Sequence, residues 1–326
     1  MIEILLKEWI EQVKYYIHLI ADYSIKESQV GAVLDDVLNL SGKMLRSKLL
    51  LLCAFLGSNW KNNKEKICKL AAMVELTHLA SLIHDDIVDD SPYRRGKVSI
   101  QGKYGKDAAV FAGDFLIARI FYYGAVENLN EAVSILSKTV EYMCIGEIEQ
   151  DLCRYQENIS EKKYFENIER KTAALFQAAS YIGAKEAGCS EEIIQKLELF
   201  VKNLGLMFQL KDDILDFTSN SKELGKETHK DFQNGIYTFP VIMALKNPKA
   251  REVLLPIMRK NKEEKLSLAE ILQLQNYIIQ FGGIEASYEK IKYLSNINRQ
   301  LIKELGQNSK ITVYLEKILN DLEVEN

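Results

Sequence analysis

Two clusters of aspartates stand out as residues that could do chemistry. The first runs from Asp85 to Asp90 (DDIVDD) and the second from Asp212 to Asp216 (DDILD), so both contain the spacing DDxxD. On a helix, this spacing places the first and last aspartates on one face. Like charges at that distance repel each other, and a bound cation relieves the repulsion. Oxygen ligands of this kind suit Mg²⁺, which commonly takes one or two carboxylates together with phosphate oxygens and water.

Other interpretations of the aspartates fit the sequence less well. A solvated acidic helix end explains one cluster as readily as a metal does, but the second cluster lies among apolar residues (MFQLKDDILDF, 207–217). Zinc prefers His and Cys at tetrahedral spacing, which are missing. The glycine-containing calcium loop of an EF-hand is also missing. The repeated motif therefore predicts Mg²⁺ held by carboxylates on helices.

Clustered basic residues accompany the aspartates. Each motif is followed by a long polar segment, 90–104 or 218–236, and loops of that length are usually functional in a compact domain. Taken singly, each cation would more often be a solvated surface residue. Beside metal-holding carboxylates they describe a polyphosphate site, and without P-loop glycines or a dinucleotide fingerprint a nucleotide is not indicated. The basic residues concerned are Lys43, Arg46, Arg94, Arg95, Lys97, Arg170, Lys171, Lys222, Lys226 and Lys230.

The elements that must position these residues are predicted to be helices. The chain has 326 residues but only 4 prolines and 17 glycines, too few turn formers for an all-β sandwich. Apolar residues recur at helical spacing almost throughout, and no alternating strand pattern is found. One all-α domain spanning residues 1–326 is therefore predicted. The expected helices cover about 4–20, 30–57, 63–90, 105–126, 129–154, 160–188, 190–217, 237–247, 249–259, 266–280, 284–306 and 310–323.

Composition excludes several other classes of protein. The formal net charge of −4 gives no basic excess for nucleic acid. Five cysteines without a CxxC motif indicate a reducing compartment, so we expect a cytoplasmic location. The longest purely apolar run, Leu49 to Leu56, is too short to span a bilayer, and the N-terminus has no signal-peptide layout. No transmembrane segment is predicted.

The motifs together resemble those of the trans-type polyprenyl diphosphate synthases. The resemblance is carried by GKMLR (42–46), LIHDDIVDDSPYRRGKVS (82–99), KT (171–172), FQLKDDILDF (208–217) and GKETHKDFQNGIYTFP (225–240). It implies an all-α fold around a deep central cavity, usually as a dimer. It also implies head-to-tail condensation of isopentenyl diphosphate with an allylic diphosphate, with two or three Mg²⁺ ions.

The resemblance also implies a role for individual residues, carried over by position. Isopentenyl diphosphate would be bound by Lys43, Arg46, His78 and Arg95, and the allylic diphosphate by Arg94, Lys171, Thr172, Gln209 and Lys226. Asp85, Asp89 and Asp212 would hold the metals, with Asp86, Asp213 and Asp216 supporting them. The segment 41–47 departs from the family's GGKRxRP, since Ser41, Met44 and Ser47 replace Gly, Arg and Pro. Lys43 and Arg46 remain, so the binding role is expected to be kept.

No protein nucleophile is evident, and this chemistry requires none. Mg²⁺ and cationic side chains make the diphosphate a better leaving group, and the isopentenyl double bond attacks the allylic cation that forms. In the family, the released pyrophosphate is thought to take the proton that is then lost. His84 beside the metal cluster is a conceivable base, but a structural role is favoured for it.

The residues before the first motif predict a long product. Bulky aromatics four or five residues before the first aspartate stop chain growth early in this family, whereas Ser81 and Ala80 are small. Within the family, the segments 73–90 and CIGEIEQ (144–150) are most similar to catalytic subunits of heptaprenyl diphosphate synthases, which in some bacteria work with a small non-catalytic partner. We therefore expect a homodimer or a heterodimer that makes side chains for isoprenoid quinones.

Four alternatives remain for the sequence. A farnesyl or geranylgeranyl diphosphate synthase would share every motif and differ in product length. A non-catalytic subunit of the same fold would be expected to lose aspartates or cationic ligands, which this chain keeps. A helical scaffold would not bind diphosphates with Mg²⁺. A class I terpene cyclase would explain one aspartate motif, but neither the second nor Lys43, Arg46 and His78.

Overall fold

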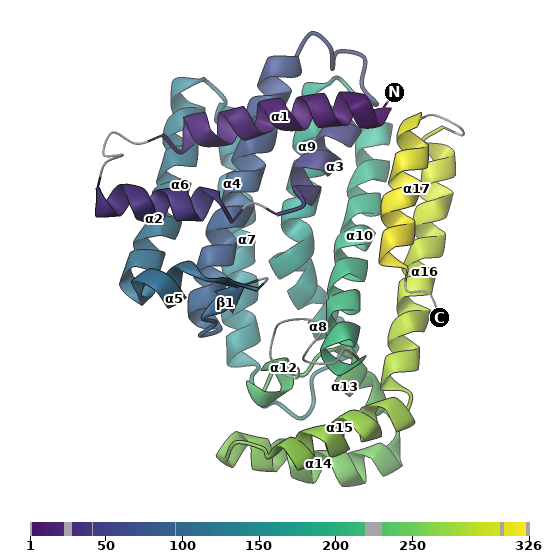
Figure 1. Cartoon of the computed structure of the whole chain (residues 1–326). Coiled ribbons are helices and arrows are strands. Elements are labelled where there is room, and N and C mark those ends of the chain that lie inside the picture. Colours follow the sequence, from purple (N-terminus) through teal and green to yellow (C-terminus); the bar gives the residue numbers. More distant parts are fainter. Residues whose placement is uncertain are drawn as a thin grey trace. The chain divides into compact units, whose positions relative to one another are not determined.

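The computed structural model describes residues 2–22, 28–40, 42–94, 96–218, 230–306 and 310–323. Almost all of the regular structure in these ranges is helical, so the predicted all-α class is confirmed (Figure 1). The helices are α1 (Ile2–Ile20), α2 (Gln29–Leu38), α3 (Leu45–Ala54), α4 (Lys64–Val88), α5 (Ile100–Tyr104), α6 (Lys106–Val126), α7 (Asn130–Leu152), α8 (Glu161–Ile168), the π-helix η1 (Glu169–Ala173), α9 (Ala174–Glu186), α10 (Glu191–Thr218), α12 (Lys230–Gln233), α13 (Phe239–Ala244), α14 (Pro248–Glu263), α15 (Leu268–Gln280), α16 (Gly283–Glu304) and α17 (Lys310–Leu322).

Four local features differ from the prediction. The segment expected to be a loop over 218–236 contains α12 (Lys230–Gln233), and its residues 219–229 lie outside the described residues. The expected helix over 30–57 is two helices, α2 and α3, because Met44 adopts a left-handed conformation with φ of 51° directly before α3. The segment expected to be a loop over 90–104 contains a hairpin of β1 (Tyr93–Arg94) and β2 (Lys97–Val98), followed by α5. The expected helix over 160–188 is interrupted by η1. Two-residue strands and a single π turn are too short to leave a periodic signal in a sequence.

The chain forms two compact units. The first comprises Met1–Val140, Leu175–Leu199 and Ser309–Ile311, and the second comprises Glu141–Ala174, Phe200–Asn308 and Thr312–Asn326. The first aspartate motif belongs to the first unit and the second motif to the second unit. That residues 1–326 form one domain remains a prediction.

In the first unit, α4 is the central helix and packs against α1, α3 and α6 (Figure 1). Its middle, residues 70–77, is buried on every side, and Ile67, Met73 and Val74 are fully buried. The helix contains neither glycine nor proline, and it ends where Asp90 turns to a φ of 47° and Pro92 follows. The first DDxxD motif therefore lies in the last turns of a helix fixed by the core.

In the second unit, the C-terminal half of α10 carries the second motif. The backbone N–H of Phe239, the first residue of α13, lies 3.5 Å from Asp213 Oδ2, and α13 packs against α8, α15 and α16. Asn203 of α10 donates to Asn298 Oδ1 at 3.0 Å, and Asn298 donates to the Phe200 carbonyl at 3.0 Å. Both asparagines are buried, so this paired bond fixes α10 against α16 at one register.

Of the described helices, two are long and apolar enough to cross a membrane by length and composition: α4 and α6. This is a weak indication, because the core helix of a soluble protein passes the same test. In α4, 72% of the apolar window is buried inside the protein, whereas in α6 the share is 39%. The burial of α4 is that of a core helix.

Candidate active site

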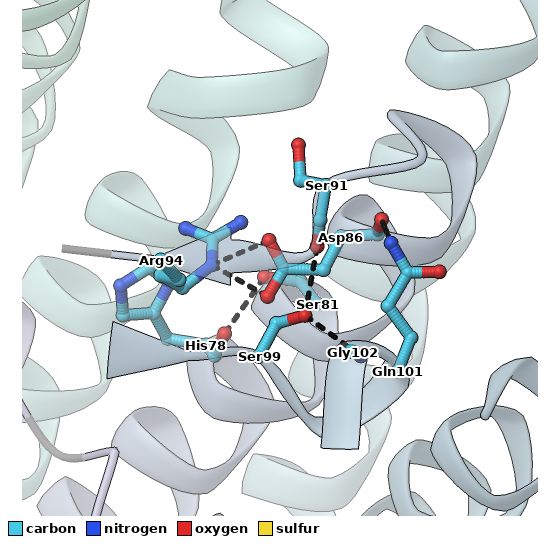
Figure 2. Close-up of polar contacts among 8 residues, drawn as sticks. All are labelled: His78, Ser81, Asp86, Ser91, Arg94, Ser99, Gln101 and Gly102. Carbon is cyan, nitrogen blue, oxygen red and sulfur yellow. Dashed lines mark hydrogen bonds and ion pairs between the residues drawn. The ribbon is translucent and has the colours of Figure 1, made fainter. Parts of the chain in front are cut away.

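The first aspartate motif separates into a buried residue and two more accessible ones. Asp86 is only 3% exposed, whereas Asp85 and Asp89 are half-buried and lie one turn apart on α4. The Nε–H of Arg94 is shared between the two carboxylate oxygens of Asp86, each 2.8 Å from the nitrogen (Figure 2). Asp86 is thus paired with Arg94, and the carboxylates that could face a metal are those of Asp85 and Asp89.

The hairpin that carries Arg94 is tied to the end of α4. The backbone N–H of Ser91 and the side-chain amide of Gln101 both donate to the Asp86 carbonyl, at 2.9 and 2.5 Å. Ser99 donates to the Ser91 carbonyl at 2.7 Å and accepts the Gly102 N–H (Figure 2). Within the described ranges, the two Nη groups of Arg94 make no hydrogen bond, and Figure 2 shows them directed away from Asp86. Arg94 therefore presents a pair of N–H groups of the kind that bind phosphate.

The residues expected to bind isopentenyl diphosphate partly converge in the first unit. Arg46 of α3 lies with Nη1 2.9 Å from Nε2 of His78, and its guanidinium stacks 4.5 Å above the ring of Phe176. Because arginine can only donate, His78 accepts through Nε2 and carries its proton on Nδ1. Lys43 is exposed just before α3, and Arg95 lies outside the described residues. The structure brings Arg46 and His78 together and gives His78 the role of orienting Arg46.

The second motif repeats the separation with different partners. Asp213 is 1% exposed, whereas Asp212 is exposed and Asp216 is half-buried. Asp213 accepts the Tyr164 hydroxyl at 2.5 Å and the Gln209 amide at 3.0 Å. Burial raises the pKa of Asp213 to about 7, and these two hydrogen bonds oppose the rise. Burial and the neighbouring Asp213 raise the pKa of Tyr164, so its hydroxyl keeps its proton and donates.

The pair Lys171 and Thr172 lies on η1, and π turns often mark functional sites. Lys171 forms an ion pair with Glu147 of α7 at 2.8 Å, and Thr172 donates to the Gln209 carbonyl oxygen at 2.9 Å. A Cβ on Gly146 would lie 3.1 Å from the Lys171 backbone nitrogen, so a small residue allows α7 to approach η1 closely. Thr172 is therefore hydrogen-bonded to Gln209, and the adjacent Lys171 is paired with Glu147, all within the second unit. Lys226 lies outside the described residues.

The residues expected to set chain length differ in burial. Ala80 is 1% exposed and belongs to the core, whereas Ser81 is half-buried and its hydroxyl donates to the His78 carbonyl at 2.8 Å. Ser81 lies one turn before Asp85 on α4, and so on the same side of that helix. Of the two, Ser81 is the position where a larger side chain has room to project.

Several partners of the site were not anticipated from the sequence. Tyr164 and Gln101 carried no motif signal, and Glu147 lies in the quoted CIGEIEQ without having been singled out. His84 lies 3.4 Å from Asp114 Oδ1 and 3.4 Å from the Val110 carbonyl, and a Cβ on Gly113 would collide with its ring. Those contacts give His84 a packing role.

The carboxylates of the site fit a metal that is bound partly by the protein and partly by the substrate. Among the described residues, no group of three or more His, Cys, Asp or Glu side chains is arranged to hold a metal ion. Asp85 and Asp89 offer two carboxylates from one helix face. Mg²⁺ is commonly bound by one or two carboxylates together with substrate phosphates rather than by an all-protein cage, and this pair is a ligand set of that kind.

Comparison with known proteins agrees with these features. The sequence model of the polyprenyl synthetase family matches residues 27–275. Component 2 of heptaprenyl diphosphate synthase from Geobacillus stearothermophilus is 34% identical over 265 residues, covering 80% of this chain and 80% of that protein. The chloroplastic solanesyl-diphosphate synthase 2 of Oryza sativa subsp. japonica is 35% identical over 279 residues, covering 84% of this chain and 67% of that protein.

A solved structure gives the same answer for the fold. The polyprenyl synthase from Caulobacter crescentus CB15, crystallised with calcium and isoprenyl diphosphate, superposes with a TM-score of 0.88 at 29% identity. The match covers 98% of this chain and 96% of that one. The class defined by fold and motifs is therefore that of the prenyltransferase enzymes. Within it, the chain belongs to the polyprenyl synthetase family.

Proposed function

We propose that this chain is a Mg²⁺-dependent trans-prenyltransferase that condenses isopentenyl diphosphate head-to-tail with an allylic diphosphate. The starter would be farnesyl or geranylgeranyl diphosphate, and the products a long-chain polyprenyl diphosphate and pyrophosphate. The observation that carries the proposal is the repeated DDxxD motif at the ends of α4 and α10, in which Asp85, Asp89 and Asp212 stay partly or fully exposed, in a member of the polyprenyl synthetase family. The product would supply side chains of isoprenoid quinones.

The allylic diphosphate would be held by side chains that donate hydrogen bonds. Arg94 offers its two Nη groups because Asp86 occupies only Nε. Lys171 and Gln209 add donors in the second unit, and Lys226 is proposed by position. Mg²⁺ bound through Asp85, Asp89 and Asp212 would neutralise the diphosphate and make it a better leaving group.

The isopentenyl diphosphate would be held by Lys43, Arg46 and Arg95. His78 would hold Arg46 by accepting from Nη1, and the Phe176 ring would support the guanidinium from one side. Charge on both substrates is met by cations, so the reacting carbons can lie in apolar surroundings.

The reaction itself needs no covalent bond to the protein. The allylic C–O bond breaks and the electron pair leaves with pyrophosphate. The isopentenyl double bond then attacks the allylic carbon, and a proton is lost from the new cation to the pyrophosphate that has just been released. His84 is not required as the base, since Val110 and Asp114 surround its ring.

A long product and an association with a second subunit complete the proposal. Small side chains at Ser81 and Ala80 would leave room for the growing chain.

On α6, Phe111, Tyr122 and Val126 are 72%, 61% and 58% exposed, which is unusual for large apolar residues outside an interface. The relative named component 2 supports either a homodimer or a heterodimer with a small subunit. Five free cysteines fit a reducing cytoplasm.

Product sizing tests the function. The purified chain is incubated with Mg²⁺, labelled isopentenyl diphosphate and farnesyl diphosphate, with and without a candidate small subunit. We expect label in prenyl chains longer than geranylgeranyl. Label that stops at geranylgeranyl would favour a short-chain synthase. No label with any allylic starter or partner would favour a non-catalytic subunit and contradict the proposal.

A further inference from the structure

A continuous chain of hydrogen bonds in the second unit links a buried tyrosine to a proposed ligand of the allylic diphosphate. Tyr164 of α8 donates to Asp213 Oδ2 at 2.5 Å, and Gln209 Nε2 donates to Asp213 Oδ1 at 3.0 Å. Thr172 of η1 donates to Gln209 Oε1 at 2.9 Å. Tyr164, Asp213 and Thr172 are buried, and Gln209 is half-buried.

The direction of these bonds fixes how Gln209 is oriented. Asp213 Oδ1 accepts from Gln209 Nε2, and the Thr172 hydroxyl donates to Gln209 Oε1, so the NH₂ group of Gln209 faces Asp213 and its carbonyl oxygen faces Thr172. One N–H of Gln209 is used by Asp213, and the second remains for another acceptor. The oxygens of a diphosphate are acceptors, so an amide in this orientation attracts them, whereas a flipped amide would offer them its carbonyl oxygen.

The same directions assign a different role to Thr172. Its hydroxyl proton is used by Gln209, so it has no donor left for a phosphate oxygen. Thr172 therefore holds the Gln209 carbonyl and keeps the amide from flipping. The network has one binding donor, Gln209, with Thr172 on its carbonyl side and Asp213 on its NH₂ side.

Asp213 can hold Gln209 only if its own carboxylate is held. Besides Gln209, its partners are the Tyr164 hydroxyl and the backbone N–H of Phe239, and the latter is long at 3.5 Å. The ring of Tyr164 packs against Phe165 and Phe239, with centroids 5.1 and 5.5 Å away. The short bond from Tyr164 is thus the main restraint on this buried carboxylate besides the bond from Gln209.

We propose that Tyr164 is a positioning residue of the allylic diphosphate site, which acts through Asp213 to hold the Gln209 amide with an N–H toward the diphosphate. The inference rests on the proposed function, because it assigns a positioning role to a residue of the proposed allylic diphosphate site. Tyr164 touches no substrate itself. Its loss is expected to weaken binding of the allylic substrate selectively.

The variant Tyr164→Phe tests this role because it removes one hydroxyl and keeps the ring packing. We expect the KM for farnesyl diphosphate, and its Kd measured with Mg²⁺ but without isopentenyl diphosphate, to rise roughly tenfold. The KM for isopentenyl diphosphate should stay within about twofold, since its proposed ligands are elsewhere. Tyr237→Phe is the matched control: this buried hydroxyl donates to the Met258 carbonyl at 3.4 Å, and its removal should change neither KM.

A double-mutant cycle separates positioning from general stability. If Tyr164 acts through Gln209, Tyr164→Phe should add nothing to the allylic KM of Gln209→Ala. An effect of Tyr164→Phe that persists in that background, or that raises both substrate KM values equally, would overturn the assignment. An active wild type with an unchanged allylic KM in Tyr164→Phe overturns the role of Tyr164 alone. A wild type that binds no farnesyl diphosphate overturns this inference and the proposed function together.

Discussion

The two DDxxD motifs share a spacing but differ in what surrounds the buried middle aspartate. Asp86 is met by a full positive charge, the guanidinium of Arg94, whereas Asp213 is met by neutral donors, the Tyr164 hydroxyl and the Gln209 amide. In both motifs the middle aspartate faces protein and the outer aspartates are more accessible. The comparison teaches that one motif can hold metal with its outer positions and organise its neighbours with its inner one.

The inner aspartates also differ in what they organise. Asp86 holds an arginine through Nε alone, so that no hydrogen bond to the described residues occupies its two Nη groups, and the backbone carbonyl of Asp86 ties the hairpin to α4. Asp213 holds an amide that is oriented from its other side by Thr172. The first arrangement positions a charge, and the second positions a dipole.

The largest expected effect comes from the outer aspartates, which should behave alike in both motifs. Asp85→Asn and Asp212→Asn should each lower kcat/KM by about a thousandfold or more, because each removes a charged metal ligand. Stability should change by less than about 0.5 kcal/mol, since neither residue is buried. Steady-state kinetics and urea unfolding check this, with the exposed Asp107→Asn on α6 as control. Near-normal activity in either variant would remove that carboxylate from the metal site.

The next largest effect is on the free energy of unfolding, and it should differ between variants of the two inner aspartates, Asp86 and Asp213. Asp86→Asn breaks a buried ion pair and leaves Arg94 without its counter-charge, so we expect a loss of about 3 kcal/mol in the free energy of unfolding. Asp213→Asn keeps an acceptor for neutral donors, so about 1 kcal/mol is expected near neutral pH. Urea unfolding of both variants at one pH measures the difference. Equal losses would mean that the charge of Arg94 does not distinguish the two sites.

A pH series sharpens the same contrast. Burial raises the pKa of Asp213 from 3.8 to about 7, so the native state binds this proton more tightly than the unfolded state does. The resulting stability is fully present below about pH 4 and is lost as pH rises to about 7. In metal-free protein, wild-type stability should therefore fall relative to that of Asp213→Asn by about 3 kcal/mol across this range. Parallel stability curves would argue against a pKa of Asp213 that is raised by burial.

The smallest expected effect on rate concerns the residue one turn before each motif. That residue is Ser81 before the first motif and Phe208 before the second. Ser81→Phe should shorten the product while changing the rate of the first condensation by no more than about twofold, because only the path of the growing chain is altered. Ser81→Ala is the control and should leave product length unchanged. An unchanged length in Ser81→Phe would contradict a chain path past Ser81. Ala80→Phe is a poorer test, because Ala80 is buried and a larger side chain there overpacks the core.

Much of the fold could be predicted because helical periodicity is local. Scarce proline, recurring apolar residues and the DDxxD spacing identified the helices and the acidic faces of α4 and α10. The pairs that distinguish the inner aspartates could not be predicted, because Tyr164 is 49 residues from Asp213 and no spacing rule links them. The π turn at Thr172 and the hairpin at Arg94 were missed because neither is long enough to repeat a periodic pattern: the π-helix has 5 residues and each strand has 2.

The division between outer and inner aspartates is tested most directly by the Kd of farnesyl diphosphate, measured with and without Mg²⁺ in four variants. In Asp85→Asn and Asp212→Asn, we predict that Mg²⁺ no longer strengthens binding as it does in the wild type. In Asp86→Asn and Asp213→Asn, we predict weaker binding overall, through the loss of order at Arg94 and Gln209, and Mg²⁺ should still strengthen binding by the wild-type factor. Loss of the Mg²⁺ effect in the inner variants, or its survival in both outer variants, would contradict the account.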